Sequence, residues 1–180
     1  MTSSRRLIPI LSMLMLPLLA GCGIFGNQVS LELTDADKQR CPPVGILAYA
    51  GEITRFEAGP GRTTDDVINR GTISGLTVSC FNTATGVDAT MSFDISASVG
   101  TTKPSGFVNL TYFVTVTNVV DQPIERKLYQ VSVPITGKHG SVHQYVGLQV
   151  PFADDGRLED QEVLIGFELT KEQLTYNIHR

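Results

Sequence analysis

From residue 87 to residue 99 the chain alternates strictly between apolar and polar side chains. The odd positions carry Val, Ala, Met, Phe, Ile, Ala and Val, and the even positions carry only Asp, Thr and Ser. Successive side chains of a β-strand point to opposite faces of its sheet. The period of two therefore predicts a strand with one face on a hydrophobic core and the other in water.

The same alternation recurs in four later segments, which we interpret as further strands. Two less regular strands are expected earlier, one broken near Gly51 and one with a bulge at Gly75, where the apolar positions change parity. In the first of the later segments, Phe113 is the only large apolar side chain on the face expected to be wet. The segments are 108–116, 129–135, 142–150 and 163–169, preceded by 44–56 and 71–81.

Turn-forming Gly, Pro, Asn and Asp residues separate these segments, as between short antiparallel strands. About seven strands at this spacing predict an all-β fold, an antiparallel β-sandwich. Pro134 and Pro151 should mark strand ends or edges, because proline cannot donate to a ladder. An immunoglobulin- or fibronectin type III-like topology fits the count, although Trp is absent and the cysteine spacing is not that of antibody domains.

A short helical turn is expected at the C-terminus. Thr170-Lys171-Glu172-Gln173 fits a capping box, in which the Thr hydroxyl and the Gln side chain each bind the other's backbone N–H. Leu174 and Tyr176 follow as apolar positions. We expect one or two turns of helix, with a frayed tail as the alternative.

The N-terminus has the layout of an export signal. Arg5 and Arg6 precede the uncharged run 7–20, which is shorter than the roughly 20 apolar residues of a membrane-spanning helix. Leu19-Ala20-Gly21-Cys22 resembles the bacterial lipobox. That resemblance implies cleavage of a signal peptide, residues 1–21, and acylation of Cys22, which would anchor the protein to membrane lipid without a spanning helix.

The position after Cys22 bears on the destination of the protein. Gly23 stands where the best-known sorting rule places an Asp for retention in the inner membrane, so the outer membrane is favoured, with the protein on the periplasmic face. Residues 22–40 are then the lipidated cysteine and a flexible tether. Residues 41–180 form the sandwich domain.

Composition and charge narrow the range of partners. The 180 residues contain 14 Lys and Arg against 18 Asp and Glu, a net charge of −4. Loss of residues 1–21 would remove two arginines and move the charge to −6. Without a basic surplus to displace counterions from a nucleic-acid backbone, nucleic acid is not expected as a partner.

Two of the three cysteines remain once Cys22 carries lipid. In an oxidising compartment, Cys41 and Cys80 are an even pair for one disulfide. Two free buried thiols are the alternative. A metal pair is disfavoured because neither a C-x-x-C motif nor a nearby His supports it.

The titratable residues show no catalytic pattern. His139 and His143 have the spacing that places two imidazoles on one face of a helix, but they fall in a Gly-flanked hairpin with no obvious third ligand. Asp65 and Asp66 are expected to cap a short turn. No nucleophile elbow and no phosphate-binding glycine loop occurs. We therefore expect no enzyme activity, no cofactor and no metal site.

Residues 54–66 form the most distinctive loop. Arg55 and Arg62 flank Gly59-Pro60-Gly61, and a pair of guanidinium groups could grip a carboxylate or a phosphate. Surface pairing with Glu57, Asp65 or Asp66 is the alternative. Arg55 and Arg62 are the candidate ligand-binding residues of the sequence.

Several short motifs resemble those of a group of small uncharacterised proteobacterial lipoproteins. They are Cys41-Pro42, Thr54-Arg55-Phe56, Gly61-Arg62, Cys80 and the segment 166–174, and the resemblance covers about residues 41–177. The group brings no activity, cofactor or catalytic residue to transfer. The sequence thus predicts a non-catalytic interaction or structural module with an envelope protein as partner, which could bind by adding a strand to a sheet edge. A small-ligand or metal-binding lipoprotein is the alternative.

Overall fold

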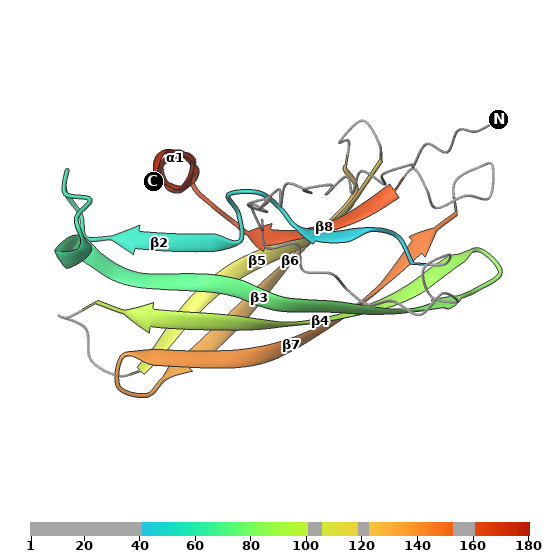
Figure 1. Ribbon diagram of the computed structural model, residues 1–180, viewed down its shortest axis with the longest axis horizontal. Coiled ribbons are helices and arrows are strands. Elements are labelled where there is room, and N and C mark those ends of the chain that lie inside the picture. The colour runs from blue at the N-terminus through green and yellow to red at the C-terminus, as the bar shows by residue number, and fades with distance from the viewer. Residues whose placement is uncertain (1–40, 101–105, 119–122, 153–160) are drawn as a thin grey trace, which may run out of the picture. The chain divides into compact units, whose positions relative to one another are not determined.

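The computed structural model describes residues 41–100, 106–118, 123–152 and 161–180 of the chain (Figure 1). The predicted signal peptide, Cys22 and the predicted tether lie outside the described residues, and so does the acidic segment 153–160.

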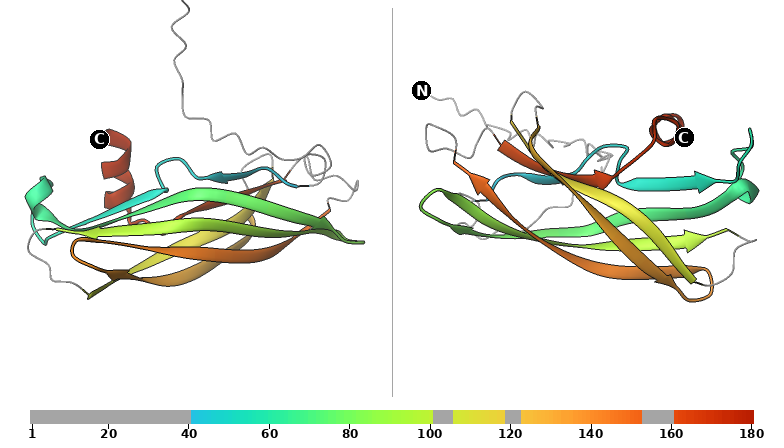
Figure 2. Two further views of the ribbon diagram at one scale, coloured as in Figure 1. Left: turned by 60° about the horizontal axis from the view of Figure 1, so that its bottom comes forward. Right: turned by 180° about the vertical axis from the view of Figure 1, so that it is seen from behind.

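Within the described residues, eight strands form two four-stranded sheets that lie face to face (Figures 1 and 2). The first sheet has the order β1-β8-β5-β6 and the second has the order β2-β3-β4-β7. The strand bounds are β1 Val44–Ile46, β2 Glu52–Phe56, β3 Val67–Asn82, β4 Gly86–Val99, β5 Gly106–Asn118, β6 Pro123–Ile135, β7 His139–Pro151 and β8 Gln161–Phe167. The predicted all-β sandwich is confirmed.

The strand pairing is not purely antiparallel, and the strand order is not that of immunoglobulin domains. All neighbouring strands are antiparallel except β1 and β8, which are parallel through three residue pairs from Val44–Val163 to Ile46–Ile165. Immunoglobulin domains have the strand orders ABED and CFG, and neither sheet here follows them. Pro134 and Pro151 lie on β6 and β7, the outer strands of their sheets, as predicted.

The first predicted strand is two strands, which explains why eight are found where about seven were expected. The chain leaves β1 after Ile46, turns through Leu47–Gly51 and begins β2 at Glu52 in the other sheet. The break falls where Gly51 predicted it. Because the chain crosses between the sheets here, one edge strand of each sheet, β1 and β2, adjoins this short loop.

The predicted bulge at Gly75 is also present. The register of β3 against β4 shifts between Ser74 and Thr77, and Gly75 has φ 65°. Because this left-handed conformation disfavours side chains with a Cβ, glycine is the residue that lets β3 change parity and keep its apolar side chains on the core.

The core fills the space between the sheets with the apolar side chains of the alternating segments. In β4 all odd-numbered side chains from Val87 to Ala97 are buried, as the period of two predicted. Phe93 makes an edge-to-face contact with Tyr112, whose ring stacks on Tyr129 at a centroid distance of 5.2 Å. The largest fully buried side chains include Phe93, Tyr112, Phe167, Ile53, Met91, Ile95, Leu110 and Ile165.

The expectation that the second face of β5 is wet holds at Asn109 but is wrong from Phe113 to Thr117. Phe113 is only 7% exposed, and the guanidinium carbon of Arg126 lies 4.5 Å from its ring centroid. Thr115 and Thr117 on the same face are buried as well. The side chain of Arg126 comes from the neighbouring strand β6 and forms an ion pair with Glu168, so long polar side chains cover this face.

The predicted disulfide between Cys41 and Cys80 is confirmed, with a Cα–Cα distance of 5.6 Å. Cys41 precedes β1 of the first sheet and Cys80 lies in β3 of the second. The bond therefore ties the beginning of the described chain to the opposite sheet, across 39 positions of sequence.

The C-terminal helix α1 spans Lys171–His179 and begins with the predicted capping box. The Gln173 backbone N–H donates to the Thr170 hydroxyl at 3.2 Å, and the Thr170 backbone N–H donates to the Gln173 side chain at 2.8 Å. Its nine residues slightly exceed the expected one or two turns. The helix lies beside β2 (Figure 2).

Candidate functional site

The predicted loop 54–66 leaves the end of β2 and closes on a short turn of 3-10 helix, Thr64–Asp66. The Thr63 hydroxyl and backbone N–H both donate to the Asp66 carboxylate, at 2.7 and 2.9 Å. These two hydrogen bonds, the hydroxyl's first, hold the pKa of Asp66 below its usual value. Asp66 therefore caps the turn, as predicted for the Asp65–Asp66 pair.

The side chain of Arg62 joins this loop to helix α1. Its guanidinium donates to the carbonyls of Gly59 and Gly61 at 2.8 and 2.6 Å and pairs with Glu172 at 3.6 Å. The guanidinium carbon also lies 5.3 Å from the ring centroid of Phe56. Arg62 thus holds the Gly-Pro-Gly loop in shape and is exposed enough to exchange Glu172 for another anion.

The side chain of Arg55 reaches from β2 to the opposite sheet. One guanidinium nitrogen donates to the Asn109 carbonyl of β5 at 2.8 Å. Among the described residues this is its one assigned hydrogen bond, so a guanidinium with five N–H groups retains donors for a ligand.

Arg55 and Arg62 line a single cavity of about 530 Å³ between the loop and α1. The structure thus brings together the two arginines that the sequence singled out. The other lining residues are Thr54, Phe56, Glu57, Ala58, Gly59, Ile68, Thr170, Glu172, Gln173 and Tyr176. Cationic donors beside apolar and aromatic walls are suited to a small organic anion.

Sequence reasoning missed the aromatic wall of this cavity. Phe56 and Tyr176 meet edge to face at a centroid distance of 4.9 Å, although 120 positions of sequence separate them. No local signal connects a residue at the end of β2 with one in α1. The contact exists because the Thr170 cap starts the helix at a point from which it runs along β2.

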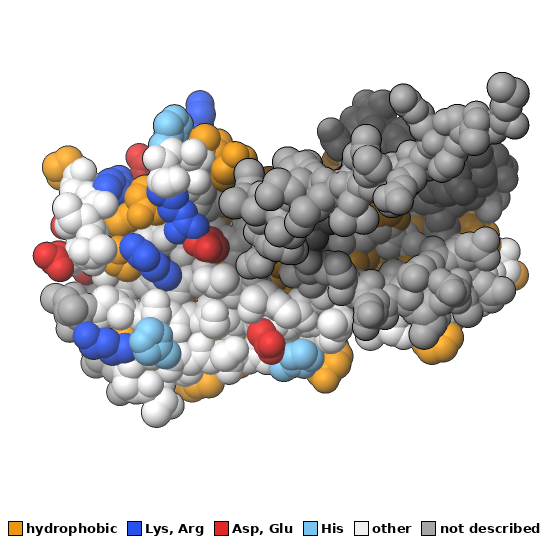
Figure 3. All heavy atoms as spheres, in the orientation of Figure 1, with side chains coloured by type: hydrophobic (Ala, Val, Ile, Leu, Met, Phe, Trp, Pro, Cys, Tyr) orange, Lys and Arg blue, Asp and Glu red, His pale blue; other side chains and the backbone are white. Residues whose placement is uncertain are grey.

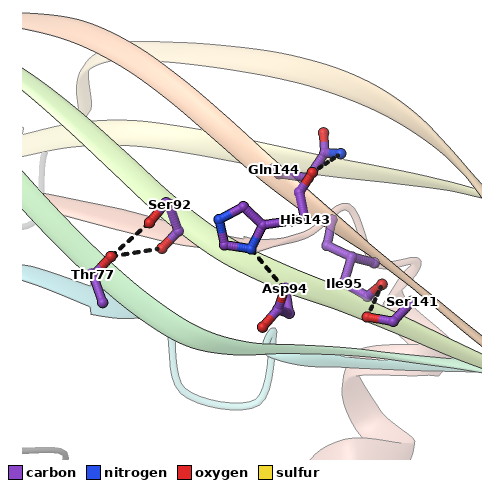
Figure 4. A network of polar contacts seen from close by, with 7 residues as sticks. All are labelled: Thr77, Ser92, Asp94, Ile95, Ser141, His143 and Gln144. Carbon is purple, nitrogen blue, oxygen red and sulfur yellow. Dashed lines mark hydrogen bonds and ion pairs between the residues drawn. The ribbon is translucent and has the colours of Figure 1, made fainter.

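His139 and His143 do not form a metal site. Both belong to β7, and four residues along a strand correspond to about 13 Å, too far for one ion to bind both imidazoles. Nδ1 of His143 lies instead 2.8 Å from Oδ1 of Asp94, directly opposite on β4 (Figure 4). Within the described ranges, no cluster of three or more His, Cys, Asp or Glu could hold a metal ion.

Comparison of the chain with protein-family models, with curated proteins and with solved structures finds no match in any of the three. Of the helices in the described part of the chain, none has the length and apolarity needed to cross a membrane.

Proposed function

We propose that the protein is a non-catalytic interaction module of the bacterial cell envelope, anchored by acylated Cys22 and facing the periplasm, with the outer membrane favoured. The lipobox resemblance supports the anchor, and the resemblance of residues 41–177 to small proteobacterial lipoproteins supports the setting. The surface of the sandwich supports the role. The observation that carries this proposal is an open sheet edge beside an apolar groove.

Strand β6 provides the edge. Among the described strands it pairs only with β5, through the ladder from Gly106–Ile135 to Thr117–Pro123. Its other side therefore offers a row of backbone N–H and C=O groups to a further strand. Ile124 and Leu128 are 50% and 56% exposed, so this edge presents two apolar side chains beside the charged Glu125, Arg126 and Lys127.

The groove lies on the outer face of the same sheet and has a volume of about 700 Å³. Arg126 borders it, but its charge is already used by Glu168 and by the ring of Phe113. The apolar lining comes from the β1–β2 loop, β5, β8 and the start of α1, with Ile46, Leu47, Ala48, Ala50, Phe113, Leu164, Leu169 and Leu174. An extended partner segment could pair with β6 and place alternate apolar side chains here.

Site-specific photo-crosslinking in cells tests this role. A photoreactive side chain at Leu128 should capture one discrete envelope protein. The same group at Thr90, an exposed site in the centre of the other sheet, is the matched control. Ile124→Lys should abolish the adduct at Leu128 by charging the edge. Failure to capture a protein at Leu128, or the same capture at Thr90, would contradict the proposal.

Binding of a small anion is the second candidate, because Arg55 and Arg62 line one cavity. Acetate and inorganic phosphate are the probes for a thermal-shift titration. Tm should rise with probe concentration in the wild type and not in Arg55→Gln with Arg62→Gln. Equal titrations of the two proteins would remove this candidate.

A further inference from the structure

The outer face of the second sheet carries a ligand-binding pattern that the proposed function does not use. Short hydroxyl side chains fill most of the outward positions on β3 and β4, whereas β7 contributes one of them. They are Thr72, Ser74, Thr77, Ser79, Thr90, Ser92, Ser96, Ser98 and Ser141. Their neighbours within the strands point into the core, and uncharged polar side chains and backbone predominate on the part of this face that Figure 3 leaves uncovered.

Two large aromatic side chains stand out from this hydroxyl-rich face. Tyr145 on β7 is 74% exposed and Phe81 on β3 is 70% exposed. The Tyr145 ring makes an edge contact with the imidazole of His143, with a centroid distance of 4.6 Å and an interplanar angle of 70°. Because this contact already limits the motion of the ring, stacking a ligand on it would cost little side-chain entropy.

Open space lies next to Tyr145. Gly147 is the next outward position on β7, and a Cβ built on it would meet no heavy atom within 4 Å. Its φ is not in the left-handed region, so the backbone does not require glycine there. The missing side chain therefore leaves open space above the backbone between Tyr145 and Gln149, about 13 Å apart along the strand, which we call the Gly147 gap.

Polar pairs lie at both ends of the Gly147 gap. At one end the carboxylate of Asp94 fixes the imidazole of His143 through Nδ1, so that Nε2, which has no partner among the described residues, is left for a ligand (Figure 4). At the other end the Gln149 amide donates to Asp88 at 3.1 Å. Each pair offers both hydrogen-bond donors and hydrogen-bond acceptors.

We propose that this face binds a glycan chain, with Tyr145 as the stacking platform for a sugar ring above Gly147. The apolar C–H face of a pyranose ring matches an exposed aromatic ring, and its hydroxyl groups match carboxylate, amide and imidazole groups placed beside that ring. Asp94–His143 and Asp88–Gln149 bind the hydroxyl groups on either side.

Charge selects a neutral glycan over a polyanion. Among the described residues, the carboxylates of Asp88 and Asp94 lie at the two ends of the Gly147 gap, opposite Gln149 and His143. They would repel a sulfated or phosphorylated chain, whereas a neutral chain meets no such repulsion. The inference rests on these side chains and not on the edge of β6.

Co-sedimentation and titration of the full-length protein test this assignment. The probes are two neutral glycans, insoluble chitin for co-sedimentation and soluble dextran for titration, and heparin as the polyanion. Binding to either neutral glycan supports the proposal. Binding to heparin alone, or to none of the three, would overturn it.

Variants locate the site on the face. Tyr145→Ala should weaken binding about ten-fold, and Tyr145→Phe, which keeps the ring, should bind nearly as well as the wild type. Gly147→Val should abolish stacking, because the valine side chain would occupy the space above residue 147, and it should leave the unfolding midpoint unchanged. Phe107→Ala is the matched control, because Phe107 is 72% exposed on the other sheet. Unchanged affinity in Tyr145→Ala, or an equal loss in Phe107→Ala, would contradict the site.

Discussion

The side-chain amide of Asn177 in α1 binds the backbone of Tyr49, 128 positions earlier in the chain. Nδ2 donates to the Tyr49 carbonyl at 2.7 Å and to the Glu52 carbonyl at 2.8 Å. Tyr49 has φ 62°, a left-handed conformation that is strained for a residue with a side chain. One buried amide therefore fixes both the strained β1–β2 loop and the position of the helix that closes the arginine cavity.

Asn177→Ala should destabilise the protein by about 1–3 kcal/mol, because two backbone carbonyls lose their donor in a site where Asn177 is only 6% exposed. Asn177→Asp should cost more, since a carboxylate would face the same two carbonyl oxygens. Urea unfolding of both variants measures the difference. Equal stability of wild type and Asn177→Ala would show that the helix is not held by this contact.

The capping box should contribute about 1 kcal/mol to the same helix. Thr170→Ala removes the acceptor for the Gln173 backbone N–H, which then has no intrahelical partner. Thr175→Ala, at an exposed position in the middle of the helix, is the matched control and should change little. Equilibrium unfolding compares the two, and an equal effect of both substitutions would argue against the cap.

The disulfide should be the largest single covalent contribution to stability. Closing a loop of about 40 residues stabilises by roughly 4 kcal/mol in the chain-entropy model. The double variant Cys41→Ser with Cys80→Ser should show a correspondingly lower urea midpoint. Dithiothreitol should lower the wild type to the same midpoint and leave the double variant unchanged. A wild type insensitive to reductant would contradict the expected role of the bond.

Alkaline pH should destabilise the protein through Tyr112. Burial, followed by the neighbouring Tyr129, raises the pKa of Tyr112 from 10.0 to about 12. The folded state thus disfavours the ionised phenol. The stability that arises from this raised pKa is fully present below pH 10 and is lost as the pH rises towards 12.

The measurement is the difference in unfolding free energy between the wild type and Tyr112→Phe. This difference should shift against the wild type between pH 10 and pH 12, because phenylalanine cannot ionise. Parallel pH profiles for wild type and Tyr112→Phe would contradict the assignment.

Local patterns predicted the elements of this fold well. The alternation of residues 87–99 became β4, the parity change at Gly75 became a bulge, and the Thr170–Gln173 pair became a helix cap. Each of these signals acts within a few residues. Such signals can be interpreted from local backbone geometry and from the burial of one face of a strand.

The features that the sequence did not predict all depend on distant parts of the chain. The parallel pairing of β1 with β8 joins the two ends of the domain, and the burial of Phe113 depends on Arg126 and Glu168 from other elements. The candidate site divides in the same way. The loop motif around Gly59-Pro60-Gly61 singled out Arg55 and Arg62, but the aromatic wall with Tyr176 requires the packing of α1 on β2.

We propose that the protein is a lipoprotein anchored at Cys22, and the intact mass of the protein purified from the membrane fraction is the decisive measurement. We predict a polypeptide that begins at Cys22 and carries the added mass of acyl chains. Cys22→Ala should leave the membrane fraction or remain unprocessed. A wild-type mass equal to the unmodified 180-residue chain, or unchanged mass and fractionation in Cys22→Ala, would contradict the account.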